Sequence, residues 1–305
     1  MKIYGIEGFN KRKNKKWIII IILISITVIG MAAFGGIKLA EHLAKQKQLE
    51  QNNINMVDNI KESNNEKNNQ NKQEQSDKVT VPNKSGNNLS EAQIKSIENI
   101  YVSKEKVAFL TFDDGPSTQV TPKILDILKQ QNIKATFFVL GTMVKSNPEI
   151  LKREQEEGHY IANHGYSHIY KKVYANENKP LEEYNKTNEL IQQALGDQNY
   201  QSNVFRFPGG STGGYYDKTK IKAKKKLKEN GIGYLDWNCL TNDADGADTK
   251  KAIMKNLKET CKGKNSIVVL MHDAPNKSLT AETLPEVIKY LREQEYDFKN
   301  LYDIL

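Results

Sequence analysis

Beyond residue 100, the chain alternates between short apolar runs and longer stretches in which apolar residues recur at helical spacing. The short runs are rich in β-branched and aromatic residues, which predicts buried strands. They cover residues 107–112, 135–140, 160–162, 204–207, 232–237 and 266–271. Each longer stretch carries one apolar stripe and predicts an amphipathic helix. These stretches cover residues 122–131, 148–157, 181–195, 218–230, 249–261 and 281–293.

This alternation predicts parallel strands that are covered by helices on the outside. Thr121 followed by Pro122 is a typical helix start, and Gly158 and Gly231 stand where two helices are expected to end. About 200 residues suit a single domain of this kind. We expect an α/β fold in the form of a closed or nearly closed β/α barrel, and a doubly wound open sheet is the alternative.

The N-terminal pattern is different, because residues 17–37 form an uncharged, mostly apolar run of 21 residues. A run of this length predicts a helix that spans a membrane. Segment 1–16 is strongly basic, so the positive-inside rule places it in the cytoplasm. A cleaved signal peptide is the alternative, although its apolar region is normally shorter. We therefore expect a single-pass anchor in the cell membrane, with the rest of the chain outside the cell.

Residues 38–100 are rich in Asn, Lys and Gln and poor in apolar residues. Such a composition does not bury enough apolar surface to offset the entropy of ordering the chain. It predicts a flexible linker between the anchor and a folded domain over residues 101–305.

Most of the formal net charge of +8 belongs to the N-terminus. Residues 1–38 hold seven of the 45 Lys and Arg and one of the 37 Asp and Glu, which leaves +2 on the remainder. We expect no nucleic-acid partner, because such a partner requires a basic face on the folded domain. Lysines within 222–228 predict a solvated helix face, with contact to an anionic polymer as the alternative. Cys239 and Cys261 permit one disulfide outside the cell, but two scattered cysteines do not predict one.

Several polar residues stand directly after predicted strands. Asp113 and Asp114 follow the first strand, His164 follows the third, Arg206 lies near the end of the fourth, and His272 follows the last. In parallel α/β folds, reactive groups gather beyond the carboxyl ends of the strands. The placement therefore favours one shared site over isolated structural residues.

Asp114, His164 and His168 are candidate metal ligands. One carboxylate with two imidazoles leaves coordination positions open for water and substrate. Zn²⁺ suits this mixed nitrogen and oxygen set, while Co²⁺, Ni²⁺ and Fe²⁺ remain candidates. By itself, the His-x-x-x-His spacing is more often two polar residues on a solvated turn, and the upstream Asp-Asp-Gly-Pro segment reverses that preference.

Hydrolysis at such a site also needs a base for the water and an acid for the leaving group. Asp113 is the candidate base, and its ordinary role would be to cap the Asp-Gly-Pro turn. His272 is the candidate acid, and it would otherwise be a hydrogen-bonded residue at a strand end. Arg206 is placed to orient Asp113 through a bidentate pair, with a surface ion pair as the alternative.

At these residues the chain resembles the polysaccharide deacetylase family, whose NodB-type domain defines carbohydrate esterase family 4. Thr-Phe-Asp-Asp-Gly-Pro at 111–116 matches the first family motif, and His-Gly-Tyr-Ser-His at 164–168 matches the second. Residues 206–210 resemble the third motif and residues 270–272 the fifth. The resemblance covers residues 101–305, which is about two thirds of the chain.

The resemblance implies a distorted (β/α)7-type barrel that removes N- or O-acetyl groups from polysaccharides with a divalent metal. It also implies the roles already considered for the candidate base, acid, arginine and metal ligands. In addition, Leu270 would line the pocket for the acetyl methyl group. The backbone N–H of Gly209 would be the oxyanion donor, at a position where the family often has Tyr, so that an aromatic wall would be lost.

The fourth family motif is altered in this chain. Leu240 occupies the position where the family often has an Asp that tunes the catalytic histidine, and Ala244 replaces a Trp. Trp237 remains as a residue that would shape the pocket. The possible partners of His272 within this region and beside it are Asp236, Asp243 and Asp273.

From the resemblance and the predicted anchor, we expect an enzyme that deacetylates N-acetylglucosamine units of a cell-surface glycan, with peptidoglycan as the substrate. An O-acetyl esterase acting on xylan or another acetylated polymer is the first alternative. A non-catalytic module that binds the cell wall is the second. The sequence does not indicate an oligomeric state.

Overall fold

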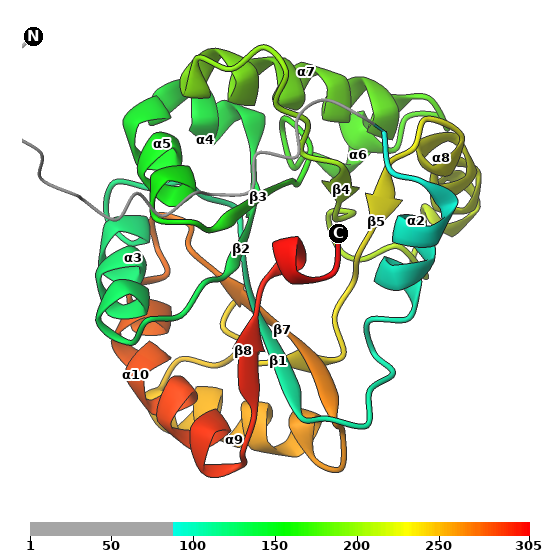
Figure 1. Ribbon diagram of the computed structural model, residues 1–305. Coiled ribbons are helices and arrows are strands. Elements are labelled where there is room, and N and C mark those ends of the chain that lie inside the picture. The colour runs from blue at the N-terminus through cyan, green and yellow to red at the C-terminus, as the bar shows by residue number, and fades with distance from the viewer. Residues whose placement is uncertain (1–87) are drawn as a thin grey trace, which may run out of the picture. The chain divides into compact units, whose positions relative to one another are not determined.

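The computed structural model describes residues 88–305 (Figure 1). The expected segment 1–16, the anchor 17–37 and most of the linker lie outside the described residues. Within them, no helix combines the length and the apolar character that crossing a membrane requires.

The centre of the described domain is a curled sheet of eight parallel strands. They are β1 (Val107–Asp113), β2 (Thr136–Val139), β3 (Tyr160–Asn163), β4 (Val204–Phe205), β5 (Gly233–Tyr234), β6 (Cys239–Leu240), β7 (Ser266–His272) and β8 (Asp297–Lys299). Their order in the sheet is β5-β4-β3-β2-β1-β7-β6. Strand β8 is not part of this order and pairs with β1. The order follows the chain outward from β1 as far as β5, which fits a partly open (β/α)7 barrel better than a doubly wound sheet.

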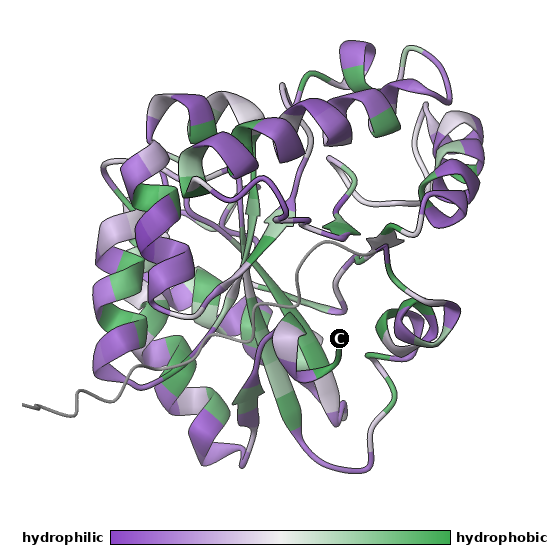
Figure 2. Cartoon of the chain, turned by 45° about the horizontal axis from the view of Figure 1, so that its top comes forward, coloured by the Kyte–Doolittle hydropathy of each residue, from purple (hydrophilic) through white to green (hydrophobic). Residues whose placement is uncertain are grey.

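Helices cover the outside of this sheet (Figure 1). The longer ones are α3 (Thr121–Gln130), α5 (Pro148–Glu156), α7 (Lys179–Leu195), α8 (Asp217–Glu229), α9 (Lys250–Cys261) and α10 (Ser278–Glu293). Two short helices, α4 (Gly141–Ser146) and α6 (Tyr170–Val173), lie between them in the chain. Figure 2 shows hydrophobic positions on the helix sides that face the strands and hydrophilic ones outside. The largest apolar cluster accordingly combines alternate residues of β1 and β7 with residues from α3, α9 and α10.

The opposite, interior face of the sheet carries a second apolar cluster, to which Phe109, Phe138 and Val268 contribute. Helix α2 (Glu91–Glu98) closes part of this interior with Ile94 and Ile97. These residues fall in the last part of the segment that we expected to be linker, so the folded unit begins earlier than residue 101. The reason is local: the Ser90 side chain caps the helix, and two isoleucines three residues apart form a short apolar stripe.

All six predicted strands and all six predicted long helices are present, with ends that differ from the expected ones by at most three residues. Gly158 and Gly231 do follow helices, with left-handed φ angles of 83° and 66°. The elements that sequence patterning missed are short, such as β6 and β8. In strands of two or three residues, an alternating pattern has no room to appear.

Cys239 and Cys261 form a disulfide, which the sequence did not lead us to predict. Cys239 lies in β6, Cys261 is the last residue of α9, and both are buried. The bond therefore fastens the end of α9 to a two-residue strand at the edge of the sheet. Spacing alone could not reveal this pairing, because it depends on how α9 packs back against β6.

Candidate metal centre and active site

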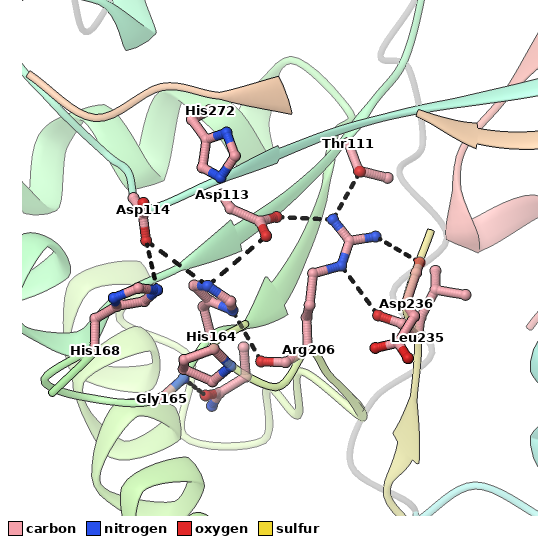
Figure 3. A network of polar contacts seen from close by, with 12 residues as sticks. Thr111, Asp113, Asp114, His164, Gly165, His168, Arg206, Leu235, Asp236 and His272 are labelled. Carbon is pink, nitrogen blue, oxygen red and sulfur yellow. Dashed lines mark hydrogen bonds and ion pairs between the residues drawn. The ribbon is translucent and has the colours of Figure 1, made fainter. Parts of the chain in front are cut away.

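The polar residues singled out in the sequence lie together at the carboxyl edge of the sheet (Figure 3). Strand β1 ends at Asp113, which is in register with His272 at the end of β7. His164 comes directly after β3, and Arg206 directly after β4. Parallel strands place all these ends at one edge, so residues up to 159 positions apart in the chain become neighbours.

Asp114, His164 and His168 form the one group in the described residues whose ligand atoms could hold a metal ion, with these atoms within 4.8 Å of one another. Asp114 Oδ1 lies 3.7 Å from His164 Nε2 and 3.6 Å from His168 Nε2. An ion bonded to such ligands at 2.0–2.2 Å holds neighbouring ligand atoms about 3.0–3.6 Å apart. The three side chains thus need to move only slightly to bind one ion.

The surroundings of Asp114 Oδ1 indicate whether these residues fit a cation. The atom is buried and has no hydrogen-bond partner among the described residues. A buried oxygen without a partner costs about 1–3 kcal/mol, and more when it is charged. A bound cation would remove this cost, so the residues present fit a divalent metal.

A contact with a backbone oxygen orients the His164 ring. Its Nδ1 lies 2.8 Å from the backbone oxygen of Arg206, which leaves Nε2 directed at Asp114. Burial lowers the pKa of His164 to about 3, although the charge of Asp114 opposes this shift. The imidazole is therefore neutral at physiological pH. With its proton on Nδ1, it offers the Nε2 lone pair that a metal requires.

Glu183 fastens the loop that carries His168. Its Oε2 accepts hydrogen bonds from the backbone N–H groups of Tyr166 (2.7 Å) and Ser167 (2.9 Å). Sequence reasoning missed this positioning residue, which lies in α7, fifteen residues after His168. No local signal in the sequence links it to the loop, because the contact depends on the packing of α7.

Asp113 is buried and uses its two carboxylate oxygens differently. Oδ1 accepts a hydrogen bond of 2.8 Å from Arg206 Nη1, while Oδ2 lies 3.7 Å from His164 Nε2 on the metal side. Burial raises the pKa of Asp113, and the Arg206 guanidinium acts against that rise. One oxygen is thus held by a cation, and the other is free to accept a proton beside the metal centre.

Arg206 is fully buried, which excludes the surface ion pair considered as its ordinary role. Besides Asp113, its guanidinium donates to Thr111 Oγ1 (2.7 Å) and to the backbone oxygens of Leu235 and Asp236 (both 3.0 Å). The group also stacks over the Phe138 ring at 3.9 Å, and the Trp237 ring lies 5.8 Å away. All three nitrogens of the guanidinium have partners, so Arg206 is a rigid support for Asp113.

Asp243 is the partner of His272. Its Oδ1 lies 2.9 Å from His272 Nδ1, and its Oδ2 accepts hydrogen bonds from the backbone N–H of His272 (2.8 Å) and from Thr280 Oγ1 (2.7 Å). Burial is the largest single effect and lowers the pKa of His272, but the hydrogen bond and charge of Asp243, together with the charges of Asp113 and Asp114, raise it overall. This environment favours a protonated imidazole, as an acid requires.

The other two candidate partners of His272 are engaged elsewhere. Asp236 accepts hydrogen bonds from the backbone N–H and the hydroxyl of Ser211, and Asp273 accepts one from Thr121. Leu240 lies in β6 and is partly buried. Asp243 therefore provides the carboxylate beside His272, three residues after position 240, where the family often has an Asp.

Gly209 and Leu270 occupy positions that suit their expected roles. Gly209 is exposed, has a left-handed φ of 73°, and its N–H donates no hydrogen bond among the described residues. Leu270 is only partly buried and lies two residues before His272 in β7, on the interior face of the sheet. A free amide and an apolar side chain thus stand at the same edge as the metal centre.

A family model of polysaccharide deacetylases matches residues 101–231 of the chain. The putative polysaccharide deacetylase YheN of Bacillus subtilis is 31% identical over 225 residues, covering 72% of this chain and 75% of that protein. A peptidoglycan-N-acetylglucosamine deacetylase of Bacillus cereus is 34% identical over 205 residues, covering 66% and 71%. Among solved structures, a Streptococcus mutans CE4 esterase superimposes with a TM-score of 0.61 at 33% identity, covering 70% of this chain and 92% of that one.

Proposed function

The chain belongs to the polysaccharide deacetylase family, and from this premise we propose that it removes N-acetyl groups from N-acetylglucosamine units of peptidoglycan. The geometry that carries the proposal is the position of Asp113. One of its oxygens is held by Arg206, and the other faces the Asp114–His164–His168 centre. A peptidoglycan-N-acetylglucosamine deacetylase among the relatives supports the choice of glycan.

Asp114, His164 and His168 would hold one divalent ion, for which we propose Zn²⁺, with Co²⁺, Ni²⁺ and Fe²⁺ as the other candidates. Such an ion, when bound, polarises the acetyl carbonyl and makes water more acidic. The chain's own groups perform the proton transfers. Asp113 Oδ2 accepts a proton from the attacking water, and His272 donates one to the departing amine of the sugar.

The free N–H of Gly209 donates to the oxygen on which negative charge develops during the attack. Leu270 offers an apolar surface to the acetyl methyl group, and Trp237 limits the pocket beside Arg206. Asp243 does not contact the substrate in this account. It raises the pKa of His272 and fixes the direction of its ring.

We also propose that the domain acts outside the cell membrane, tethered by residues 17–37 through the linker. The disulfide between Cys239 and Cys261 supports this location, because such bonds persist in oxidising compartments and are rare in the cytosol. An extracellular domain close to the membrane also has direct access to peptidoglycan.

The test is acetate release by the zinc-loaded protein, offered peptidoglycan, chito-oligosaccharides and acetylxylan in parallel. We expect release from the two N-acetylated substrates, and a loss of about a hundredfold or more in Asp113→Asn with the metal content unchanged. The matched control is Asp297→Asn, an exposed carboxylate at the opposite end of the sheet. Faster release from acetylxylan would identify an O-acetyl esterase, and glycan binding without any release would identify a non-catalytic module.

A further inference from the structure

The space next to Gly209 is occupied by a side chain from another element. A Cβ built on Gly209 would lie 2.4 Å from Tyr170 Oη and 2.9 Å from Tyr170 Cζ. Both distances are far below van der Waals contact. The tip of the Tyr170 ring therefore fills the space that a side chain at position 209 would enter. Because this position lacks a side chain, the ring can approach the turn closely.

Tyr170 is held in place from two sides. It is the first residue of α6, and its ring centroid lies 5.6 Å from that of His168. On the other side it packs edge-to-face on Tyr174, at 5.9 Å between centroids. The Tyr174 hydroxyl donates a hydrogen bond of 2.7 Å to the backbone oxygen of Pro208. Helix α6 is thus fastened to the turn that carries Gly209, and Tyr170 contacts both His168 and that turn.

The Tyr170 side chain is not a core residue. Tyr170 is 42% exposed, and its hydroxyl makes no hydrogen bond among the described residues. Tyr174, its neighbour in the same helix, is buried and hydrogen-bonded and already provides the packing between α6 and the turn. An exposed aromatic face with a free hydroxyl beside an oxyanion donor has the character of a ligand-contact surface.

We propose that Tyr170 is a substrate-binding residue that forms the wall of the cleft beside Gly209 and stacks on the N-acetylhexosamine ring being deacetylated. This inference rests on the proposed function, because it assigns the contact to the sugar of the same substrate. The apolar C–H face of a pyranose ring fits an aromatic face, and the free hydroxyl is available to a sugar hydroxyl. Tyr170 of α6 fills the space that the side chain of a Tyr at position 209 would occupy.

Trp237 lies on the other side of the same turn. A Cβ built on Gly210 would be 3.3 Å from the Trp237 ring. The Gly209–Gly210 turn therefore contacts two aromatic side chains: Trp237, which is half-buried near Arg206, and Tyr170, which is 42% exposed. Of the two rings, Tyr170 offers the larger exposed face to a glycan.

The test compares Tyr170→Ala with the wild type, both zinc-loaded, on a chito-oligosaccharide and on an aryl acetate that lacks a sugar. We expect kcat/KM on the oligosaccharide to fall about tenfold, and turnover of the aryl acetate to stay within about twofold. Tyr170→Phe should retain most of the oligosaccharide activity, since the stacking face is kept. The control is Tyr290→Ala, a half-buried tyrosine of α10 outside the site, which should leave both activities unchanged.

A second measurement tests the geometry without turnover. Calorimetric titration of a chito-oligosaccharide should show weaker binding to zinc-loaded Tyr170→Ala than to the wild type. Wild-type activity and binding in Tyr170→Ala would overturn the proposal, as would an equal loss on both substrates, which would indicate damage to the metal centre. A wild type that releases no acetate from any glycan would defeat the proposed function, whereas weaker oligosaccharide binding by the variant would still support the wall.

A double-mutant cycle tests the contact between positions 209 and 170. Gly209→Ala places a methyl group against Tyr170 in the wild type, but not in Tyr170→Ala. The backbone strain of alanine at a φ of 73° is the same in both backgrounds and cancels in the cycle. We expect Gly209→Ala to reduce kcat/KM on the oligosaccharide more strongly when Tyr170 is present. Equal reductions would contradict the contact.

Discussion

At the scale of single residues, the proposed proton acceptor and the proposed proton donor each have their own counterion. Asp113 lies against Arg206, and His272 lies against Asp243, while both lie beside the candidate metal centre. Asp243 contributes most to the rise in the pKa of His272, since it offers one oxygen to the ring and the other to the backbone N–H and Thr280. These three hydrogen bonds fix the orientation of the carboxylate toward the imidazole.

The pH dependence of activity should therefore respond to Asp243. If His272 acts as the acid, activity is lost as pH rises through its pKa. Asp243→Asn removes the charge that raises this pKa, so the alkaline limb of the kcat/KM profile should move to lower pH. The profile is measured on a chito-oligosaccharide with the zinc-loaded protein.

The control for this change is Asp245→Asn, two residues later in the same loop but exposed. It should leave the alkaline limb where it is in the wild type. An unchanged limb in Asp243→Asn would show that His272 does not provide the proton that limits the reaction.

Sequence reasoning reached most of these residues, because the motifs around Asp113 and His164 place chemically distinctive groups directly after strands. It could not choose among Asp236, Asp243 and Asp273 as the partner of His272. All three are acidic residues near strand ends, and the choice depends on how the loop after β6 folds back toward α10. The sequence carried no signal for Tyr170 or Glu183 either. The contact of Tyr170 with Gly209 and that of Glu183 with the His168 loop join residues that are distant in the chain.

At the scale of elements, the disulfide is the strongest link between an edge strand and its covering helix. Strand β6 has only two residues, and it pairs with β7 alone among the described strands. Two ladder residues contribute little to stability by themselves. The covalent bond from Cys239 to Cys261 fixes α9 beside β6, and the loop after β6 carries Asp243.

Removal of this bond should destabilise the domain measurably. For cysteines 22 positions apart, the loss of chain entropy in the unfolded state corresponds to about 3 kcal/mol. We expect Cys239→Ser/Cys261→Ser to lower the free energy of unfolding by about this amount in urea titrations. A reductant should lower the stability of the wild type toward that of the variant and leave the variant unchanged. Equal unfolding midpoints for oxidised wild type and variant would contradict this role.

The elements themselves were largely predictable, for a physical reason. Long helices such as α7 and long strands such as β1 and β7 repeat their apolar pattern over enough residues to be recognised. Helix α2 was missed because its surroundings are polar and only Ile94 and Ile97 mark its buried stripe. The disulfide was missed because it joins two elements whose packing the sequence does not display.

At the scale of the whole described domain, the curled parallel sheet brings the parts of the site together. Residues 113, 164, 206 and 272 come from the ends of four strands, and no segment of the chain holds more than part of the centre. The parallel arrangement was predictable from alternating strands and helices, and it explains why motifs so far apart in the sequence share one edge. The incomplete closure between β5 and β6 was not predictable, because it depends on strands of two residues.

The central claim is that Asp114, His164 and His168 bind one divalent ion beside Asp113. Anomalous diffraction at the zinc edge, from crystals of the protein grown with Zn²⁺, tests it most directly. The account predicts a single strong peak at about 2.0–2.2 Å from one oxygen of Asp114 and one nitrogen of each histidine. Crystals of His168→Ala should show a much weaker peak. An empty map at this position, with zinc bound elsewhere or not at all, would contradict the account.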